Sequence, residues 1–286
     1  MAITIEPASA ALGARVTGID LAAPIGGDDF ETLHRAILDH QVLVFPGQEI
    51  GEDDHIRFAG LWGTLPVRHR YRSRREKDVA HKSIMLVSNI REDGEPIGSL
   101  PDGEMMFHSD GAYDETPYMY TMLYAVEIPS AGGNTLFADM YGAYETLPDA
   151  LKRRLAGCHA RQLYYSGTVQ KDQPAGEYYG AAIHPIFIEH EETRRTAIYV
   201  SRLITEAIVE LEAEESAAVL EQVFDHCERD ELIYEHAWHP GDFVMWDNRC
   251  VTHARRDFPE TERRLLRRTV TQGHAPRAAR TTVAAR

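Results

Sequence analysis

The stretch that decides the interpretation of this chain is Met105-Met106-Phe107-His108-Ser109-Asp110-Gly111-Ala112-Tyr113. Its apolar residues predict a β-strand, in which side chains alternate between two faces. His108 and Asp110 would then point to the same face, while Ser109 points away. An imidazole and a carboxylate side by side can hold one metal ion, and two His with one carboxylate form the ligand set of non-haem iron oxygenases. A second His from a distant part of the sequence is needed to complete such a set.

The pattern His-x-acid is a weak signal by itself. A chain of 286 residues with 14 His and 45 acidic residues contains about two such triplets by chance. This chain has three, but His226-Cys-Glu228 ends a helical pattern, where residues two apart do not share a face. His190-Glu-Glu192 falls in a charged stretch that is typical of a solvated turn. For His108 and Asp110, the alternative to metal binding is a buried His that is hydrogen-bonded to a nearby Asp.

Length and composition predict a globular protein with one large domain or two small ones. The net charge of −15 argues against a nucleic-acid-binding surface, which needs a basic face. The sequence shows neither a signal peptide nor an apolar run long enough to span a membrane, so we expect a cytoplasmic protein. Cys158, Cys227 and Cys250 are widely spaced, which favours reduced thiols over disulfides or a zinc cluster.

The N-terminal part predicts a helix over 28–39, a buried strand over 41–45 and a second helix over 52–62. A basic segment, Arg68-His-Arg-Tyr-Arg-Ser-Arg-Arg75, then stands out in an acidic chain. It is either a solvated loop or a cover over the site that supplies a cation to an anionic substrate.

Further along, we expect a strand over 118–127, a glycine-containing loop at 132–135 that ends with the hydroxyl of Thr135, and helices over 139–155 and 205–227. A strand over 232–238 then leads through a turn at 239–242 into a buried strand over 243–246.

The C-terminal part supplies the missing His and two arginines. His253 follows the buried strand and is the natural third ligand. Residues 263–271 predict another strand, in which Arg264 and Arg268 share one face with Cα atoms about 13 Å apart. That spacing is too long for both to hold one terminal carboxylate in the same way. One could bind the far end of a dicarboxylate through the planar guanidinium while the other lies nearer the metal.

Together these motifs resemble the taurine dioxygenase and 2,4-dichlorophenoxyacetate dioxygenase family. The resemblance covers nearly the whole chain and rests on Gly18-Ile-Asp-Leu21, Val42-Leu-Val-Phe-Pro-Gly47, His108-x-Asp110, Gly132-Gly-Asn-Thr135, Trp246-Asp-Asn-Arg249, His253, Arg264 and Arg268. The fold that it implies is mainly β with flanking helices (α+β), with a double-stranded β-helix (cupin-like jelly-roll) core. It also implies a single domain over residues 1–286, with a disordered tail from about residue 275.

By this resemblance, His108, Asp110 and His253 bind Fe(II), and 2-oxoglutarate and O2 are cosubstrates. Arg264 with Thr135 would hold the distal carboxylate of 2-oxoglutarate, and Arg268 would lie nearer its chelating carboxylate and the substrate anion. The implied reaction hydroxylates the substrate and releases succinate and CO2.

The substrate implied is a small organic anion. The segment 245–251 with His253 looks more like the phenoxyacetate branch, which favours an aryloxyalkanoate-type carboxylate over a sulfonate or sulfate ester. Candidate contacts to its acidic group are Arg68, His69, Arg70 and Tyr71. A homodimer or homotetramer is also expected from the family likeness.

Two other classes of protein remain possible from the residues. A zinc hydrolase could use two His and an Asp with a water as fourth ligand, but it would not explain Arg264 and Arg268. A jelly-roll protein that only captures an anion would explain the arginines but not the ligand set.

Overall fold

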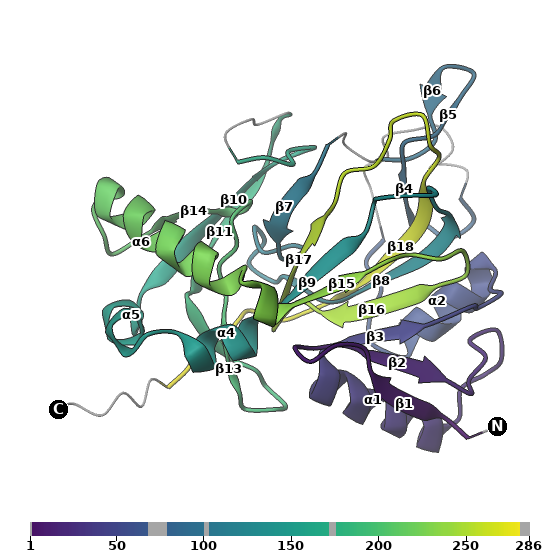
Figure 1. Ribbon diagram of the computed structural model, residues 1–286, viewed down its shortest axis with the longest axis horizontal. Helices are drawn as coiled ribbons and strands as arrows, with labels where there is room; N and C mark the ends of the chain where they lie inside the picture. The colour runs from purple at the N-terminus through teal and green to yellow at the C-terminus, as the bar shows by residue number, and fades with distance from the viewer. Residues whose placement is uncertain (1, 68–78, 100–102, 172–175, 281–286) are drawn as a thin grey trace.

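Two β-sheets that face each other form the centre of the molecule (Figure 1). The computed structural model describes residues 2–67, 79–99, 103–171 and 176–280. The larger sheet has seven strands in the order β1-β2-β3-β16-β8-β18-β4, and the smaller has four in the order β15-β9-β17-β7. The expected jelly-roll core with flanking helices is therefore confirmed.

The strands have the following bounds. The seven-stranded sheet contains β1 (Thr4–Pro7), β2 (Ala14–Thr17), β3 (Val42–Phe45), β16 (Phe243–Asp247), β8 (Tyr118–Glu127), β18 (Leu265–Gln272) and β4 (Met85–Ser88). The four-stranded sheet contains β15 (Ile233–His236), β9 (Thr135–Asp139), β17 (Val251–Arg255) and β7 (Met105–His108). Smaller sheets contain β11 (Tyr178–Pro185), β10 (His159–Tyr165) and β14 (Thr205–Ile208), then β12 (Phe187–Glu189) with β13 (Thr196–Ile198), and β5 (Arg91–Glu92) with β6 (Glu95–Pro96).

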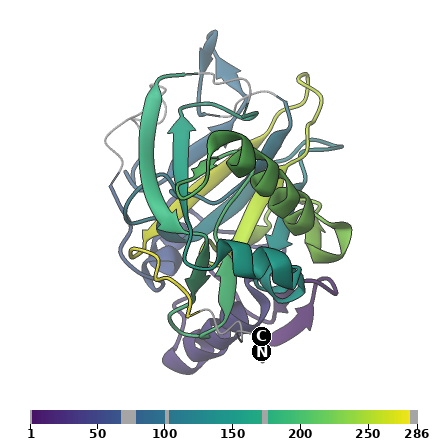
Figure 2. The same ribbon diagram turned by 90° about the vertical axis from the view of Figure 1, so that its left-hand side faces the viewer.

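The helices of the described residues lie on the outside of the sheets (Figures 1 and 2). They are α1 (Gly27–His40), α2 (Glu52–Gly60), α4 (Met140–Thr146), α5 (Asp149–Leu155), α6 (Ala213–Cys227) and the short 3-10 helix η1 (Asp230–Leu232). Helix α1 packs against β3 and α2 against β18, whereas α6 packs against β14. The helices α1 and α2 therefore leave the inner face of the large sheet available for the site.

Strand β16 of the large sheet is covered on both of its faces. All five of its residues are buried. Val244 and Trp246 belong to the core between the two sheets, whereas Phe243 and Met245 belong to the core under α1 and α2. A strand covered on both faces is apolar along most of its length, here Phe243 to Trp246, which explains why this segment is recognisable in the sequence without alternating polarity.

Two of the predicted helices are wrong in extent. The segment 139–155 is two helices, α4 and α5, because Pro148 lacks a backbone N–H and its predecessor is biased away from helical geometry. The segment 205–227 begins with β14 and becomes helical only at Ala213. The apolar residues at its start pack in a sheet, so tertiary pairing overrides the helical pattern there.

The strands on either side of the turn at 239–242 do not pair with each other. β15 pairs with β9 in the small sheet, and β16 pairs with β3 and β8 in the large sheet. The turn therefore crosses from one sheet to the other, which a local sequence pattern does not reveal.

The C-terminal segment stays in contact with the fold further than expected. Ala278 forms a β-bridge with Ile188, and the carbonyl of Arg277 accepts a hydrogen bond from Glu189 N. The prediction of disorder from about residue 275 is therefore wrong for residues 275–280. Residues 281–286 lie outside the described part. The three cysteines are unpaired and buried, as expected. Within the described residues, none of the helices combines the length and the apolar character that crossing a bilayer requires.

Candidate active site

His108 and His253 lie on neighbouring strands of the small sheet. They are direct partners in the antiparallel pairing of β7 with β17. Side chains of directly opposed residues lie on the same face, so the two rings come together, with centroids 4.1 Å apart. Residues 145 positions apart in the sequence are thus brought into one site by strand register.

Asp110 reaches the same site by a different route from the one predicted. We expected it on the strand with His108, but β7 ends at His108 and Asp110 lies in the turn that follows. Gly111 turns the chain with φ +75°, where a side chain would also press on Tyr118. The prediction that strand alternation places Asp110 is therefore wrong. Asp110 nevertheless faces the same site as His108.

The three side chains are close enough to share one ion. Asp110 Oδ1 lies 4.0 Å from His108 Nε2, and Asp110 Oδ2 lies 3.9 Å from His253 Nε2. An ion that binds nitrogen and oxygen at about 2.1 Å can bridge ligand atoms up to about 4.2 Å apart. The donor set also fits iron, because two imidazoles and one carboxylate on one side leave the other positions open.

Hydrogen bonds fix how these side chains face the site. His108 Nδ1 lies 3.0 Å from the carbonyl oxygen of Met106, so this nitrogen carries the proton and Nε2 keeps its lone pair. The Thr121 hydroxyl donates to Asp110 Oδ2 at 2.7 Å, and it accepts from the Asn248 amide at 2.9 Å. Neither Thr121 nor Asn248 was singled out for this role in the sequence.

The charge states also suit metal binding. Burial lowers the pKa of His108 and of His253, so both rings are neutral near neutral pH, the form that binds metals. Burial acts to raise the pKa of Asp110, but the charge and hydrogen bond of Arg268, together with the neighbouring His253 and His108, outweigh it and hold this pKa below its ordinary value. Arg268 donates to Asp110 Oδ1 at 2.6 Å. Asp110 is therefore a carboxylate at neutral pH.

Arg264 is a buried cation without a carboxylate partner among the described residues. It is 2% exposed, and its Nε has no hydrogen-bond partner. Its guanidinium donates a long hydrogen bond of 3.4 Å to the carbonyl of Gly133. Burial and the charge of Arg255 lower its pKa to about 9, so it stays charged near neutral pH. A buried unpaired charge is costly, and an anionic ligand would remove that cost.

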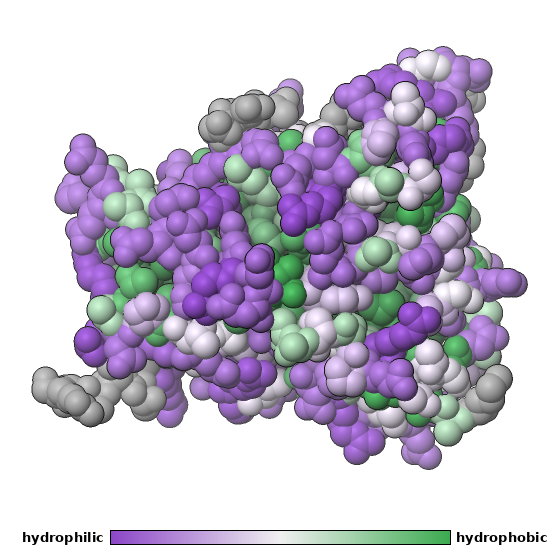
Figure 3. Space-filling view, in the orientation of Figure 1, coloured by the Kyte–Doolittle hydropathy of each residue, from purple (hydrophilic) through white to green (hydrophobic). Residues whose placement is uncertain are grey.

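These residues line one cavity of about 630 Å³ between the two sheets. His108, Asp110, His253, Thr135, Arg264 and Arg268 all contribute to its wall. Thr135 is buried, and its hydroxyl accepts a hydrogen bond of 3.0 Å from Trp238 Nε1. A strip of apolar residues runs down the middle of the face in Figure 3, between more polar surfaces on both sides. The cavity volume is in the range that holds small-molecule ligands.

Comparison with known proteins agrees with the iron ligand set that the site geometry indicates. The family model "Taurine catabolism dioxygenase TauD, TfdA family" matches residues 4–270. The chain belongs to the TauD/TfdA family. It is therefore a 2-oxoglutarate-dependent dioxygenase, and members of this family depend on Fe(II), 2-oxoglutarate and O2.

Relatives in this family match nearly end to end. Pentalenolactone F synthase of Streptomyces avermitilis is 38% identical, over 95% of this chain and 94% of the relative. An (S)-phenoxypropionate/alpha-ketoglutarate-dioxygenase of Sphingobium herbicidovorans is 33% identical, over 93% of each chain. The crystal structure of a taurine dioxygenase from Burkholderia xenovorans has a TM-score of 0.80 at 25% identity, covering 96% of this chain and 93% of that one.

One solved TauD/TfdA-like structure contains ligands. AAD-2 in complex with Mn(II) and N-oxalylglycine has a TM-score of 0.79 at 25% identity, covering 96% of this chain and 99% of that one.

The other residues predicted for the site have different outcomes. Arg68, His69, Arg70 and Tyr71 lie outside the described residues, so their role stays a prediction. Arg268 lies on β18, but Arg264 lies just before its first residue, Leu265, so the predicted strand is too long at this end. Both arginines nevertheless line the same cavity, whereas Arg267 lines a different hollow.

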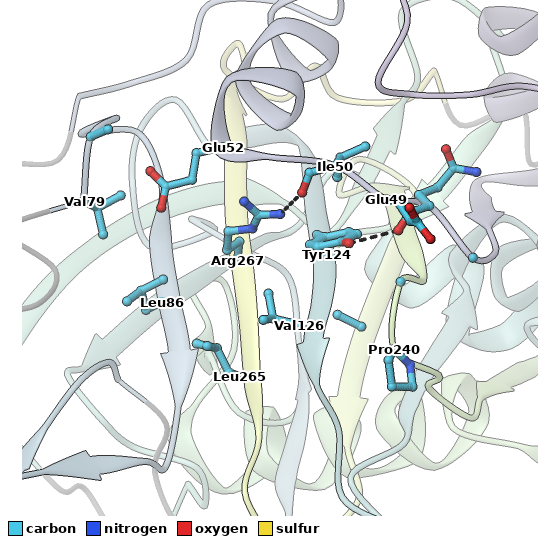
Figure 4. A pocket seen from close by; sticks show the side chains of 15 residues that line it. Glu49, Ile50, Glu52, Val79, Leu86, Tyr124, Val126, Pro240, Leu265 and Arg267 are labelled. Atoms are coloured by element: carbon cyan, nitrogen blue, oxygen red, sulfur yellow. Dashed lines mark hydrogen bonds between the residues drawn. The ribbon is translucent and has the colours of Figure 1, made fainter.

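Arg267 lies in a separate groove of about 860 Å³ (Figure 4). Its guanidinium donates to the carbonyl of Ile50 at 2.5 Å and lies over the ring of Tyr124. None of His108, Asp110, His253, Arg264 and Arg268 is among the described residues that line this groove, so we do not assign the reaction to it.

A second buried cluster of potential metal ligands consists of His190, Asp247 and Cys250. The prediction of a solvated turn at 190–192 is wrong for His190, which is only 1% exposed. Its Nε2 lies 3.0 Å from Asp247 Oδ2, and its Nδ1 accepts hydrogen bonds from the backbone N–H groups of Glu192 and Thr193. Both ring nitrogens are therefore already used.

Proposed function

We propose that His108, Asp110 and His253 hold Fe(II) in this dioxygenase, and that the enzyme hydroxylates a small organic anion. The convergence of the three side chains on one cavity is the observation that carries the proposal. Their spacing, the lone pair left on His108 Nε2 and the low pKa of Asp110 support it.

We propose that Arg264 and Thr135 bind the distal carboxylate of 2-oxoglutarate. Arg264 has an unused Nε–H, and its planar guanidinium suits a carboxylate. Arg268 lies against Asp110, where its positive charge keeps that carboxylate ionised and orients it. These side chains bind and position the reactants, and the cavity between the sheets shields them from water.

When bound, the iron supplies the oxidising chemistry, using O2 and 2-oxoglutarate and yielding succinate, CO2 and a hydroxylated product. The contribution of the protein is orientation and charge. Among the described residues that line the cavity, the buried or half-buried charged side chains are Arg255, Arg264, Arg268 and one acid, Asp110. This positive excess favours an anionic substrate in addition to the anionic cosubstrate.

We propose an aryloxyalkanoate-type carboxylate as the substrate class. The support is the (S)-phenoxypropionate dioxygenase relative and a second relative named alpha-ketoglutarate-dependent 2,4-dichlorophenoxyacetate dioxygenase, which is 28% identical. A sulfate ester or sulfonate is the alternative, because a relative named alkylsulfatase is 26% identical over 92% of this chain. The cytoplasmic location and the homo-oligomeric state remain predictions.

The test begins without substrate. Anaerobic addition of Fe(II) and 2-oxoglutarate should produce a weak visible charge-transfer band. A zinc hydrolase or an anion-binding protein would give no such band, and its absence would contradict the proposed iron site. Succinate release should then be measured with phenoxyacetate, phenoxypropionate, alkyl sulfates and alkyl sulfonates. Stimulation by the sulfur compounds alone would replace the proposed substrate class with the alternative.

A further inference from the structure

We infer that Tyr113, Tyr164 and Tyr179 form an aromatic wall that selects a substrate with a flat ring. The inference rests on the proposed function, because it assigns the part of the same cavity that receives the substrate. None of the three was assigned a role from the sequence.

The three rings form one contact group on the cavity wall. Tyr113 is stacked on Tyr164, with centroids 5.1 Å apart and planes 16° apart. Tyr179 meets Tyr113 edge to face at 5.2 Å and lies 6.0 Å from Tyr164. The rings come from the turn after Asp110 and from strands β10 and β11, which lie beside β7 in Figure 1.

The backbone holds these rings in place. Gly167 N donates to the hydroxyl of Tyr164 at 3.2 Å, which fixes that ring from its polar end. At Gly180, an added Cβ would lie 3.1 Å from the ring of Tyr113 and 3.2 Å from its carbonyl oxygen. The glycine therefore allows β11 to approach Tyr113 closely. A positioned aromatic surface loses little conformational entropy when a ligand binds to it.

The wall is also next to the reacting end of the cavity. Tyr113 follows Asp110 by three residues, and the charge of Arg268 acts on its hydroxyl. Burial raises the pKa of Tyr113 well above its ordinary value, so the hydroxyl remains a hydrogen-bond donor. A substrate ring against Tyr164 and Tyr179 would thus place a polar substituent near Tyr113 and Arg268, close to the metal ligands.

A purely structural role for the cluster fits less well. Structural aromatic clusters are normally buried, but Tyr179 is 42% exposed and its neighbour Tyr178 is 59% exposed. Both line the cavity. The cavity of about 630 Å³ is also large for 2-oxoglutarate with a substrate of only a few atoms, since pockets of this size hold drug-sized ligands.

The test compares two ether acids that differ in the ring. Phenoxyacetate and butoxyacetate carry the same carboxylate and ether oxygen, but only the first has an aromatic ring. Their binding is measured anaerobically by titration calorimetry with the full chain loaded with Fe(II) and 2-oxoglutarate. We expect phenoxyacetate to bind about twofold to tenfold more tightly, which is the range for one favourable aromatic contact. Tyr164→Leu should remove most of this preference.

Two control variants isolate the ring. Tyr164→Phe keeps the ring but loses the hydrogen bond to Gly167, so it should retain most of the preference. Tyr144→Leu changes a tyrosine of α4 that packs on Phe187, outside the cavity, and should leave the preference unchanged. Equal affinity for the two acids, no binding of either acid, or an unchanged preference in Tyr164→Leu would overturn the inference. The charge-transfer band needs no substrate, so it separates this failure from failure of the iron site.

Discussion

Two clusters of potential metal ligands among the described residues are alike in composition but different in what surrounds them. His108, Asp110 and His253 lie on a cavity, and their ligand atoms face one another across nearly 4 Å. His190 and Asp247 are in direct hydrogen-bond contact at 3.0 Å, with no cavity between them. The first cluster, which we call the open cluster, has room for an ion. The second, which we call the closed cluster, does not.

The difference is also visible in the use of lone pairs. Both ring nitrogens of His190 have hydrogen-bond partners, and Asp247 accepts from the backbone and the guanidinium of Arg249. In the first cluster, His108 uses only Nδ1 and keeps Nε2 for the site. The comparison teaches that a set of ligand residues indicates a metal site only when lone pairs remain unused and face open space.

The largest expected effect is on the iron site itself. Asp110→Ala should abolish the charge-transfer band and 2-oxoglutarate turnover, because it removes the only carboxylate among the three proposed ligands. Asp247→Ala is the matched substitution in the other cluster, and its folded fraction should keep the band. Visible spectra of both variants under anaerobic conditions provide the measurement. A band that survives in Asp110→Ala would break the comparison.

The second effect is on stability. Asp247→Ala should lower the free energy of unfolding by about 3–5 kcal/mol, because it leaves His190 and Arg249 without their shared carboxylate in a buried position. Urea unfolding followed by circular dichroism measures this loss. Asp225→Ala, an exposed partner of Arg202, is the control and should cost no more than about 1 kcal/mol. Similar losses in both variants would show that the closed cluster is not structural.

A third experiment tests the role of Arg264 in binding 2-oxoglutarate beside the open cluster. Arg264→Ala should raise the Kd for 2-oxoglutarate roughly 10- to 100-fold, since a hydrogen bond to a charged group contributes about 1.5–3 kcal/mol. The Kd for Fe(II) alone should change little. Arg263→Ala removes the neighbouring exposed arginine, which pairs with Glu127, and is the control. Equal changes in both dissociation constants would contradict the role of Arg264.

A buried His outside both clusters gives the smallest effect near neutral pH. His55 on α2 is fully buried, and its Nε2 lies 2.9 Å from the hydroxyl of Thr269. Burial, followed by the charge of Arg267, lowers its pKa to about 3. Between pH 6.5 and 3 the unfolded chain therefore binds a proton that the folded chain does not, so stability falls as the pH falls.

His55 contributes up to about 1.4 kcal/mol per pH unit to this decrease in the free energy of unfolding. His55→Gln should flatten the decrease between pH 6.5 and 4 by that amount, while His274→Gln at an exposed position should not. Urea unfolding at several pH values measures the slopes. Identical slopes in native protein and His55→Gln would show that this ring does not resist protonation.

Much of the fold and of the open site was predictable from the sequence. Buried strands such as 41–45 and 243–246 are apolar on both faces, so they are recognisable locally. His108 and His253 were predicted together, and the family likeness explains why. The closed cluster was not predictable, because nothing in the local pattern shows that His190 is buried against Asp247, 57 residues away.

Two of the errors arise because long-range pairing decides local structure. β14 is a strand because it pairs with β10, despite a helical apolar pattern. β15 and β16 enter different sheets although a short turn joins them. The position of Asp110 after the end of its strand has a local cause instead, which is the turn at Gly111.

The central claim is that one metal ion binds at the open cluster and none at the closed one. Crystals of the protein grown anaerobically with Fe(II) and 2-oxoglutarate, measured at the iron absorption edge, test it most directly. We predict a single anomalous peak within about 2.3 Å of His108 Nε2, His253 Nε2 and an Asp110 carboxylate oxygen. A peak between His190 and Asp247, or no peak at the open cluster at saturating Fe(II), would contradict the account.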